Sequence, residues 1–225
     1  AAVESLSLCI SHFKEYFDDI SESFTSFLLS WIDDIEDRHH VTSAIYSLKK
    51  LITSDALNDN VILDNVLQSA AKHLSHPALN EIDLGIDGSG ISLEEMKVAF
   101  LSLIRTTTKY VFKKADSIEN NFFIDFLPNL IPILCESLDS NTYYQKHVMK
   151  TILLICSCCY GDGQDVVLAF CDFFLKIFEN NLDLSICFFS NIFNSSISVS
   201  YPDEFFQDIY SKCLQELNEG NNQII

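Results

Sequence analysis

Apolar residues recur at spacings of three and four along almost the whole chain, and this periodicity limits the possible folds more than any other feature. One clear stripe consists of Val41, Ala44, Ile45, Leu48 and Ile52. Residues at that spacing lie on one face of an α-helix, where they can be buried together. Glycine and proline number only 6 and 4, so the tight turns of a β-rich fold are poorly supplied. The sequence therefore predicts an all-α protein.

Similar stripes divide the chain into about ten helices joined by short polar turns. After 41–52 they cover 61–74, 96–111, 117–138, 143–159, 164–179, 182–194 and 202–217. A capping box, Ser92 followed by Glu95, opens the helix that contains 96–111. Stacking such helices in two layers predicts an α-solenoid of antiparallel helical hairpins, in which each hairpin contacts only its neighbours.

The first two helices are expected to form an antiparallel pair. The first carries an apolar stripe and ends at Asp18-Asp19; the stripe is Leu6, Cys9, Ile10, Phe13 and Phe17. The second follows two candidate caps, Ser21 and Ser23. Its stripe is Phe24, Phe27, Leu28, Trp31 and Ile32.

Residues 75–92 form the one clear break in the helical pattern. They contain Pro77 and the glycines Gly85, Gly88 and Gly90, which predicts an internal flexible loop. No linker rich in Pro, Ser or Gly divides the rest, so we expect 1–225 to form a single domain. Because the chain begins with Ala1-Ala2, we expect it to be a fragment of a longer chain.

The formal net charge of -18 restricts the possible partners. Residues 1–40 hold nine acids and two bases, and residues 115–225 hold fifteen and four. Nucleic acids and anionic membranes need basic contacts, so direct binding to either is not expected. A basic partner is the better electrostatic match. The alternative is that the negative charge only maintains solubility.

The eight cysteines and the lengths of the apolar runs indicate the compartment. Most of the cysteines lie inside apolar runs, as expected of small reduced core residues in a cytoplasmic or nuclear protein. No apolar stretch approaches the roughly 18 residues that read as a candidate membrane span.

Two charged segments are candidate protein-binding sites. The first is an acidic turn beside Trp31, made of Asp33, Asp34, Glu36 and Asp37. Tryptophan is a frequent interface anchor, although a core position is the alternative in an amphipathic helix. The second is a basic ridge formed by Arg105, Lys109, Lys113 and Lys114, for which a solvated helix face is the alternative.

The sequence contains only weak matches to metal-binding, redox and catalytic motifs. Cys156 and Cys159 form a C-x-x-C without a second ligand pair, which favours core cysteines over zinc or redox chemistry. The loop 85–92 resembles part of a calcium loop but has Gly85 and Met96 at two ligand positions. His39 and His40 point in different directions, so they are not expected to chelate one ion. Since no catalytic motif is recognisable, we expect neither an enzyme nor a cofactor.

Residues 126–155 resemble a HEAT repeat of the armadillo-like class. A first helix contains Pro132 within an apolar pattern, Leu138-Asp139-Ser140 closes it, and Val148, Ile152 and Ile155 line the return helix. Residues 27–52 form a weaker copy, with Asp37, Val41, Ala44 and Leu48 at the expected places. The pattern departs at Thr42, where a basic residue is usual, and only Lys150 is near that register in the later copy.

Among proteins built from HEAT repeats, the chain is similar in general character to importin-β-like nuclear transport receptors. That resemblance implies binding of basic cargo and of a small GTPase. Cohesin and condensin subunits, phosphatase scaffolds and tubulin-binding domains are the other open families. The tubulin-binding type is the less expected, because such domains present basic turns to acidic tubulin and this chain is acidic.

The sequence thus predicts a protein-binding scaffold that takes basic segments of other proteins through acidic surfaces. The alternative is a helical domain of an RNA-associated, translation-associated or chromosome-organising complex that uses the basic ridge 105–114. Charge reversal on that ridge would separate the two.

Overall fold

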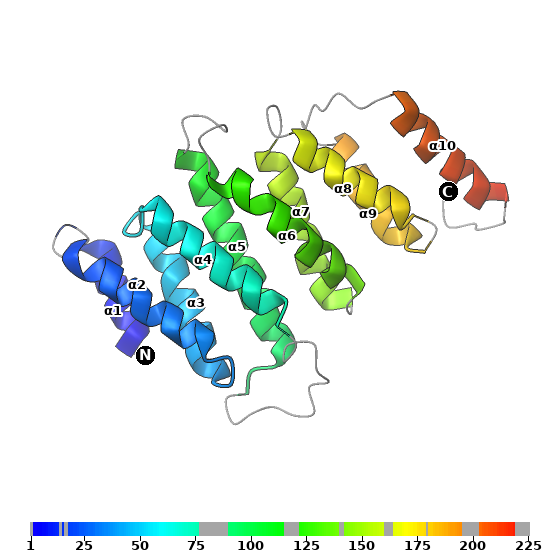
Figure 1. The fold of residues 1–225 in the computed structure, drawn as a ribbon. Helices are drawn as coiled ribbons and strands as arrows, with labels where there is room; N and C mark the ends of the chain where they lie inside the picture. The colour runs from blue at the N-terminus through cyan, green and yellow to red at the C-terminus, as the bar shows by residue number, and fades with distance from the viewer. Residues whose placement is uncertain are drawn as a thin grey trace. The chain divides into compact units, whose positions relative to one another are not determined.

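The computed structural model describes residues 2–13, 15, 18–76, 90–114, 122–139, 142–159, 164–178, 180–194 and 203–218. Over those ranges it contains ten α-helices, one short 3-10 helix (η4) and no strand (Figure 1). The α-helices are α1 (Ala2–His12), α2 (Asp18–Asp33), α3 (Arg38–Thr53), α4 (Asn60–Leu74), α5 (Leu93–Lys114), α6 (Phe122–Glu136), α7 (Thr142–Cys158), α8 (Gln164–Lys176), α9 (Leu182–Asn194) and α10 (Asp203–Asn218); η4 covers Ser137–Asp139. The prediction of an all-α fold is confirmed.

Helix boundaries follow local capping chemistry. The side chain of Asp37 accepts a hydrogen bond from the backbone N–H of His40 at 3.0 Å and so caps α3. Asp59 caps α4 in the same way. The capping box before α5 is confirmed, because the Glu95 N–H donates to Ser92 Oγ and the Ser92 N–H donates to Glu95 Oε2. Of the predicted loop 75–92, residues 77–89 lie outside the described residues.

The chain divides into two compact units, Ala1–Thr151 and Ile152–Ile225, with the boundary inside α7. In the first unit, α3 packs between α1 and α5, and α4 packs between α2 and α6. These two rows form two layers, held together where α2 packs on α3 and α4 packs on α5 (Figure 1). Residues 34–37 join α2 to α3, and these two helices pack on each other. Residues 54–59 join α3 to α4. The prediction of one domain over 1–225 stays a prediction.

The core of the first unit centres on α3 and α5. Every member of the predicted α3 stripe is buried, as are Leu51 and the serines Ser43 and Ser47. The buried apolar residues of α5 repeat at the same spacings; they are Met96, Phe100, Leu101, Leu103, Ile104 and Val111. Burying a large aliphatic or aromatic side chain contributes about 1.5–3 kcal/mol before the entropy of ordering it is subtracted. Helical periodicity therefore identified the elements that hold this unit together.

The predicted stripe of α1 is wrong in most positions. Leu6, Cys9 and Phe13 are exposed, Ile10 is buried, and Phe17 lies outside the described residues. The buried residues of α1 are Ser7 and Ile10. Ser7 can be buried because it is small and donates its hydroxyl proton to the Glu4 carbonyl at 2.8 Å. A serine whose hydroxyl is hydrogen-bonded, and not the predicted Leu6, is thus buried in α1.

The predicted start of α2 is also wrong. The helix begins at Asp18 rather than after Ser23, so Ser21 and Ser23 lie inside it and do not cap it. Asp18 and Asp19 therefore begin α2 instead of ending α1. Phe24, Leu28 and Ile32 of the predicted α2 stripe are buried, whereas Phe27 is exposed and Trp31 is half-buried.

The second unit is held by aromatic contacts. The rings of Phe174 in α8 and Phe188 in α9 stack with centroids 4.1 Å apart, and Ser185 Oγ donates to the Phe174 carbonyl at 3.0 Å. Phe205 of α10 contacts Phe189 of α9 edge-to-face at 5.8 Å. Among the α10 side chains that the structure describes, Phe205 is the buried one. Over the described residues, no helix has both the length and the apolar character required to cross a bilayer.

Candidate functional site

The predicted acidic turn lies between α2 and α3, and its four acids have different roles. Asp33 ends α2, and Asp37 caps α3 while its Oδ2 contacts His40 Nδ1 at 2.8 Å. Asp33 Oδ1 lies 2.9 Å from His73 Nε2 and 3.6 Å from Lys72 Nζ. Asp34 and Glu36 are exposed and make no ion pair with any described residue. Two of the four carboxylates therefore remain available to a partner.

An aromatic face of α2 leads to this turn. The rings of Trp31 and His40 stack with centroids 4.2 Å apart, and Phe27 packs against Trp31 at 4.9 Å. Phe27 is 44% exposed and Ile20, on the same side of the helix, is 46% exposed. We call Ile20, Phe27, Trp31 and the adjoining His40 the α2 aromatic face. Trp31 thus takes neither a fully buried nor a fully exposed position.

The contact between Asp33 and His73 anchors α2 to α4. The His73 side chain is 3% exposed and stacks on Phe100 of α5 with centroids 5.6 Å apart. Burial lowers the pKa of His73, while its hydrogen bond to Asp33 and the charge of Asp33 oppose that shift. His73 Nδ1 is buried without a hydrogen-bond partner among the described residues. A neutral imidazole that donates through Nε2 fits this environment.

The predicted basic ridge of α5 does not form one exposed surface. Arg105 is half-buried, and its Nη1 donates to the His147 carbonyl at 3.1 Å and to Thr151 Oγ1 at 3.0 Å. Burial lowers the pKa of its guanidinium. Lys109 and Lys113 are exposed. Arg105 therefore links α5 to α7, while the two lysines face solvent.

Lys114 is occupied by a cluster at the end of α5. Its Nζ lies 2.6 Å from Asp55 Oδ1 and 5.6 Å from the ring centroid of Tyr110. The Tyr110 hydroxyl donates to the same carboxylate, and burial together with Asp55 raises the pKa of Tyr110. Asp55 has a φ of 64°, a conformation that non-glycine residues adopt rarely. This cluster ties Asp55, the second residue after α3, to the last turns of α5.

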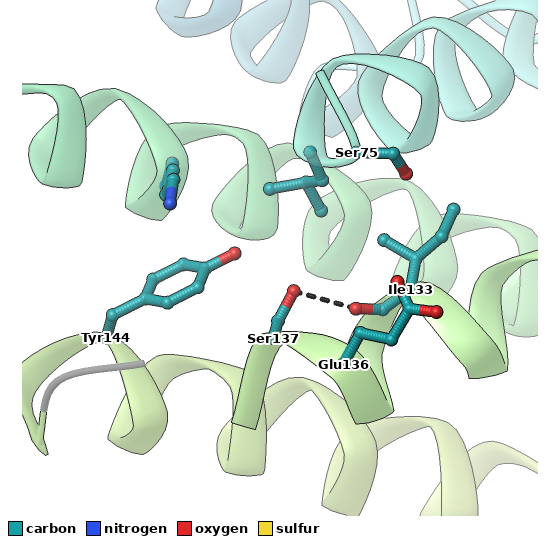
Figure 2. Close-up of a pocket in the computed structure, with 7 residues that line it drawn as sticks. Ser75, Ile133, Glu136, Ser137 and Tyr144 are labelled. Carbon is teal, nitrogen blue, oxygen red and sulfur yellow. Dashed lines mark hydrogen bonds between the residues drawn. The ribbon is translucent and has the colours of Figure 1, made fainter. Parts of the chain in front are cut away.

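A polar pocket of about 100 Å³ lies where α4 and α6 end and η4 begins (Figure 2). The seven residues that line it are Leu74, Ser75, Lys97, Ile133, Glu136, Ser137 and Tyr144. Tyr144 and Ser137 point toward the same space, and Ser137 Oγ donates to the Ile133 carbonyl at 2.7 Å (Figure 2). The pocket is small, and its lining contains no histidine or cysteine.

Two groups in this pocket have perturbed pKa values. Lys97 Nζ lies 5.4 Å from the centroid of the Tyr144 ring. Burial lowers the pKa of Lys97, with Glu94 opposing, and burial raises the pKa of Tyr144 to about 12, with Ser137 opposing. Sequence reasoning missed the pocket because its residues come from five elements with no common motif. The one local sign of the pocket in the sequence is Lys97, a charged residue next to Met96 at the edge of an apolar stripe.

The cysteines of the C-x-x-C segment lie in the core. Cys156 and Cys159 are buried, as is Cys171 of α8. Burial raises the pKa of Cys156 well above its usual range and raises that of Cys159 to about 12. Thiols in such surroundings are poor nucleophiles and poor metal ligands. Over the described residues no group of three or more His, Cys, Asp or Glu side chains is placed to hold a metal ion; loop residues 85–89 lie outside them.

Comparisons with protein families, with curated proteins and with solved structures find no significant match for this chain.

Proposed function

We propose that this protein is a non-enzymatic scaffold that binds basic segments of other proteins at the turn between α2 and α3. The observation that carries the proposal is that Asp34 and Glu36 are exposed without an ion pair among the described residues, in the turn that follows the helix with the partly exposed aromatics Phe27 and Trp31. Carboxylates beside aromatic rings suit a chain that carries both positive charge and apolar surface.

The charge distribution supports the same partner. The first forty residues hold nine acids and two bases, and the whole chain has a net charge of -18. A field of that sign speeds the approach of positive segments and disfavours nucleic acid and anionic membranes. Binding should therefore weaken as salt rises.

The wider architecture we propose is a HEAT-like α-solenoid of antiparallel hairpins, of the kind used by importin-β-like nuclear transport receptors. Supporting features are the two layers of the first unit, Pro132 inside α6, and Asp37 at the turn before the buried stripe that starts at Val41. Basic cargo and a small GTPase would then be the partners, and the cytoplasm or nucleus the compartment.

A titration with a lysine- and arginine-rich nuclear-targeting peptide at low ionic strength tests the proposal. We expect Asp34→Asn with Glu36→Gln to weaken binding about tenfold, as expected when two partly exposed ion pairs are lost. The matched control is Asp172→Asn with Asp183→Asn, which removes two exposed carboxylates from α8 and α9. It should change the affinity less than about twofold. Equal losses in the two double variants, or no binding by the parent protein, would refute the proposal.

The exposed lysines of α5 support a second candidate. Lys109 and Lys113 face solvent on one side of the helix, where they could dock an acidic partner in an RNA-associated, translation-associated or chromosome-organising complex. Lys109→Glu with Lys113→Glu would abolish such binding. The same change would leave binding of the basic peptide intact if the acidic turn is the site.

A further inference from the structure

The α2 aromatic face is an exposed apolar surface with carboxylates at one end. Ile20, Phe27 and Trp31 follow one side of α2, and Asp34 is the first residue after that helix. Glu36 lies in the turn that follows. We infer that this face binds arginine in preference to lysine side chains of the basic partner, an inference that rests on the proposed function.

The aromatic geometry favours a flat cation. The Trp31 and His40 rings are 25° from parallel and Phe27 is tilted against Trp31 by 55°. The Trp31 and His40 rings therefore cover one face of each other. Phe27 as a residue is 44% exposed and the His40 side chain is 46% exposed, so both keep ring surface open to solvent. A guanidinium group is planar and weakly hydrated, so it stacks on such rings at less desolvation cost than an ammonium group.

The carboxylates add a second basis for selectivity. Asp34 and Glu36 are exposed in the turn that follows α2. A guanidinium group can present two parallel N–H donors to one carboxylate, whereas lysine offers a compact point charge. Stacking and bidentate pairing at one place both favour arginine.

Other occupants of this face are disfavoured by charge. A second copy of the chain would bring another segment with nine acids and two bases against it, and an anionic membrane would be repelled in the same way. A segment with arginines beside small apolar residues matches both the rings and the acids. We therefore commit to an arginine-bearing protein segment.

The single tryptophan of the chain is Trp31, so its fluorescence reports on this face alone. The probes are two unstructured peptides of equal length and charge, one with arginines and one with lysines, separated by glycine and serine. We expect the arginine peptide to change the Trp31 emission and to bind about fivefold more tightly than the lysine peptide. Anisotropy of a dye on each peptide measures the affinities independently.

Phe27→Ala should remove most of that preference while the protein stays folded, because the side chain is partly exposed. The matched control is Phe206→Ala in α10, where the replaced phenylalanine is 50% exposed; it should keep the preference. Far-ultraviolet circular dichroism checks that both variants retain the parent helicity.

The outcomes separate this inference from the proposed function. If both peptides bind equally and both need Asp34 and Glu36, arginine selectivity is refuted and the acidic-turn proposal stands. If neither peptide binds, both are refuted. A preference for arginine that survives Phe27→Ala, or an effect of Phe206→Ala of the same size, would contradict the aromatic face as its source.

Discussion

The acidic turn between α2 and α3 and the basic end of α5 are both clusters of like charge in the sequence. They differ in whether their charged side chains have partners inside the fold. At the turn, Asp34 and Glu36 face solvent without an ion pair among the described residues. On α5, Arg105 is committed to α7 and Lys114 to Asp55. Charges that pair within the fold act on stability, whereas charges left in solvent are available to a partner.

The largest expected effect is on the basic side of this comparison. Arg105→Ala removes two hydrogen bonds from a half-buried guanidinium and leaves the His147 carbonyl and Thr151 hydroxyl without that donor. We expect the free energy of unfolding to fall by about 2–3 kcal/mol. Lys109→Ala, one turn further on an exposed site, should change it by less than about 0.5 kcal/mol. Chemical denaturation measures both, and equal effects would mean that α5 is one solvated ridge after all.

The Asp55 cluster gives the next largest effect. Asp55→Ala removes the acceptor of Tyr110 and Lys114 and keeps a positive φ, so we expect a loss of about 2 kcal/mol. Asp55→Gly loses the same partners but adopts that φ without steric cost, so it should be about 1 kcal/mol more stable than Asp55→Ala. Denaturation midpoints of the two variants decide this. A glycine variant no more stable than the alanine variant would show that the backbone is not strained there.

Asp37 tests whether the acidic turn also supports the fold. Asp37→Ala removes the cap of α3 and should cost about 1 kcal/mol, whereas Asp37→Asn keeps a capping oxygen and should cost much less. Peptide binding should fall slightly in both, since each removes one charge. Thermal unfolding of the pair gives the answer, and identical losses would assign the effect to charge instead of capping.

The smallest effect is a pH dependence that comes from His73. Burial lowers its pKa in the folded protein below the usual 6.5, the hydrogen bond to Asp33 and the charge of Asp33 oppose that shift, and Lys72 and His76 lower the pKa further. Above pH 6.5 the residue is neutral in both states. As pH falls below 6.5 the unfolded chain takes up a proton more readily than the folded protein does, so the free energy of unfolding should decrease.

His73→Gln removes this titration and should flatten the fall in stability between pH 7 and pH 5. His147, whose pKa is also lowered by burial, contributes with the same sign in both proteins and cancels in the difference. Unfolding curves at each pH provide the comparison. A slope unchanged by the substitution would show that His73 titrates alike in both states.

Local patterns predicted the elements well where one apolar face decides the packing. The α3 stripe from Val41 to Ile52 and the capping box at Ser92 depend on residues within a few positions of each other. The same patterns gave wrong predictions at α1, where the buried face contains Ser7, and at the start of α2, where the helix begins at Asp18. Small, internally satisfied polar residues carry no hydrophobic signal.

The roles of charged residues could be predicted only in part. The acidic turn could be predicted because its residues are adjacent in the sequence. The exposure of Asp34 and Glu36 could not, because it depends on which other side chains of the fold lie near them. The contacts of Arg105 with Thr151 and of Tyr110 with Asp55 join residues 46 and 55 positions apart. No periodicity encodes such pairs, and the pocket beside Lys97 and Tyr144 was missed for the same reason.

The most direct test of the central claim is an amide chemical-shift titration of the isotopically labelled protein with the arginine peptide. We predict shifts concentrated in residues 20–40, around Phe27, Trp31, Asp34 and Glu36, and unchanged signals for Lys109 and Lys113. Shifts centred on α5, or spread evenly over the acidic residues of the chain, would contradict the claim that the turn between α2 and α3 is the binding site.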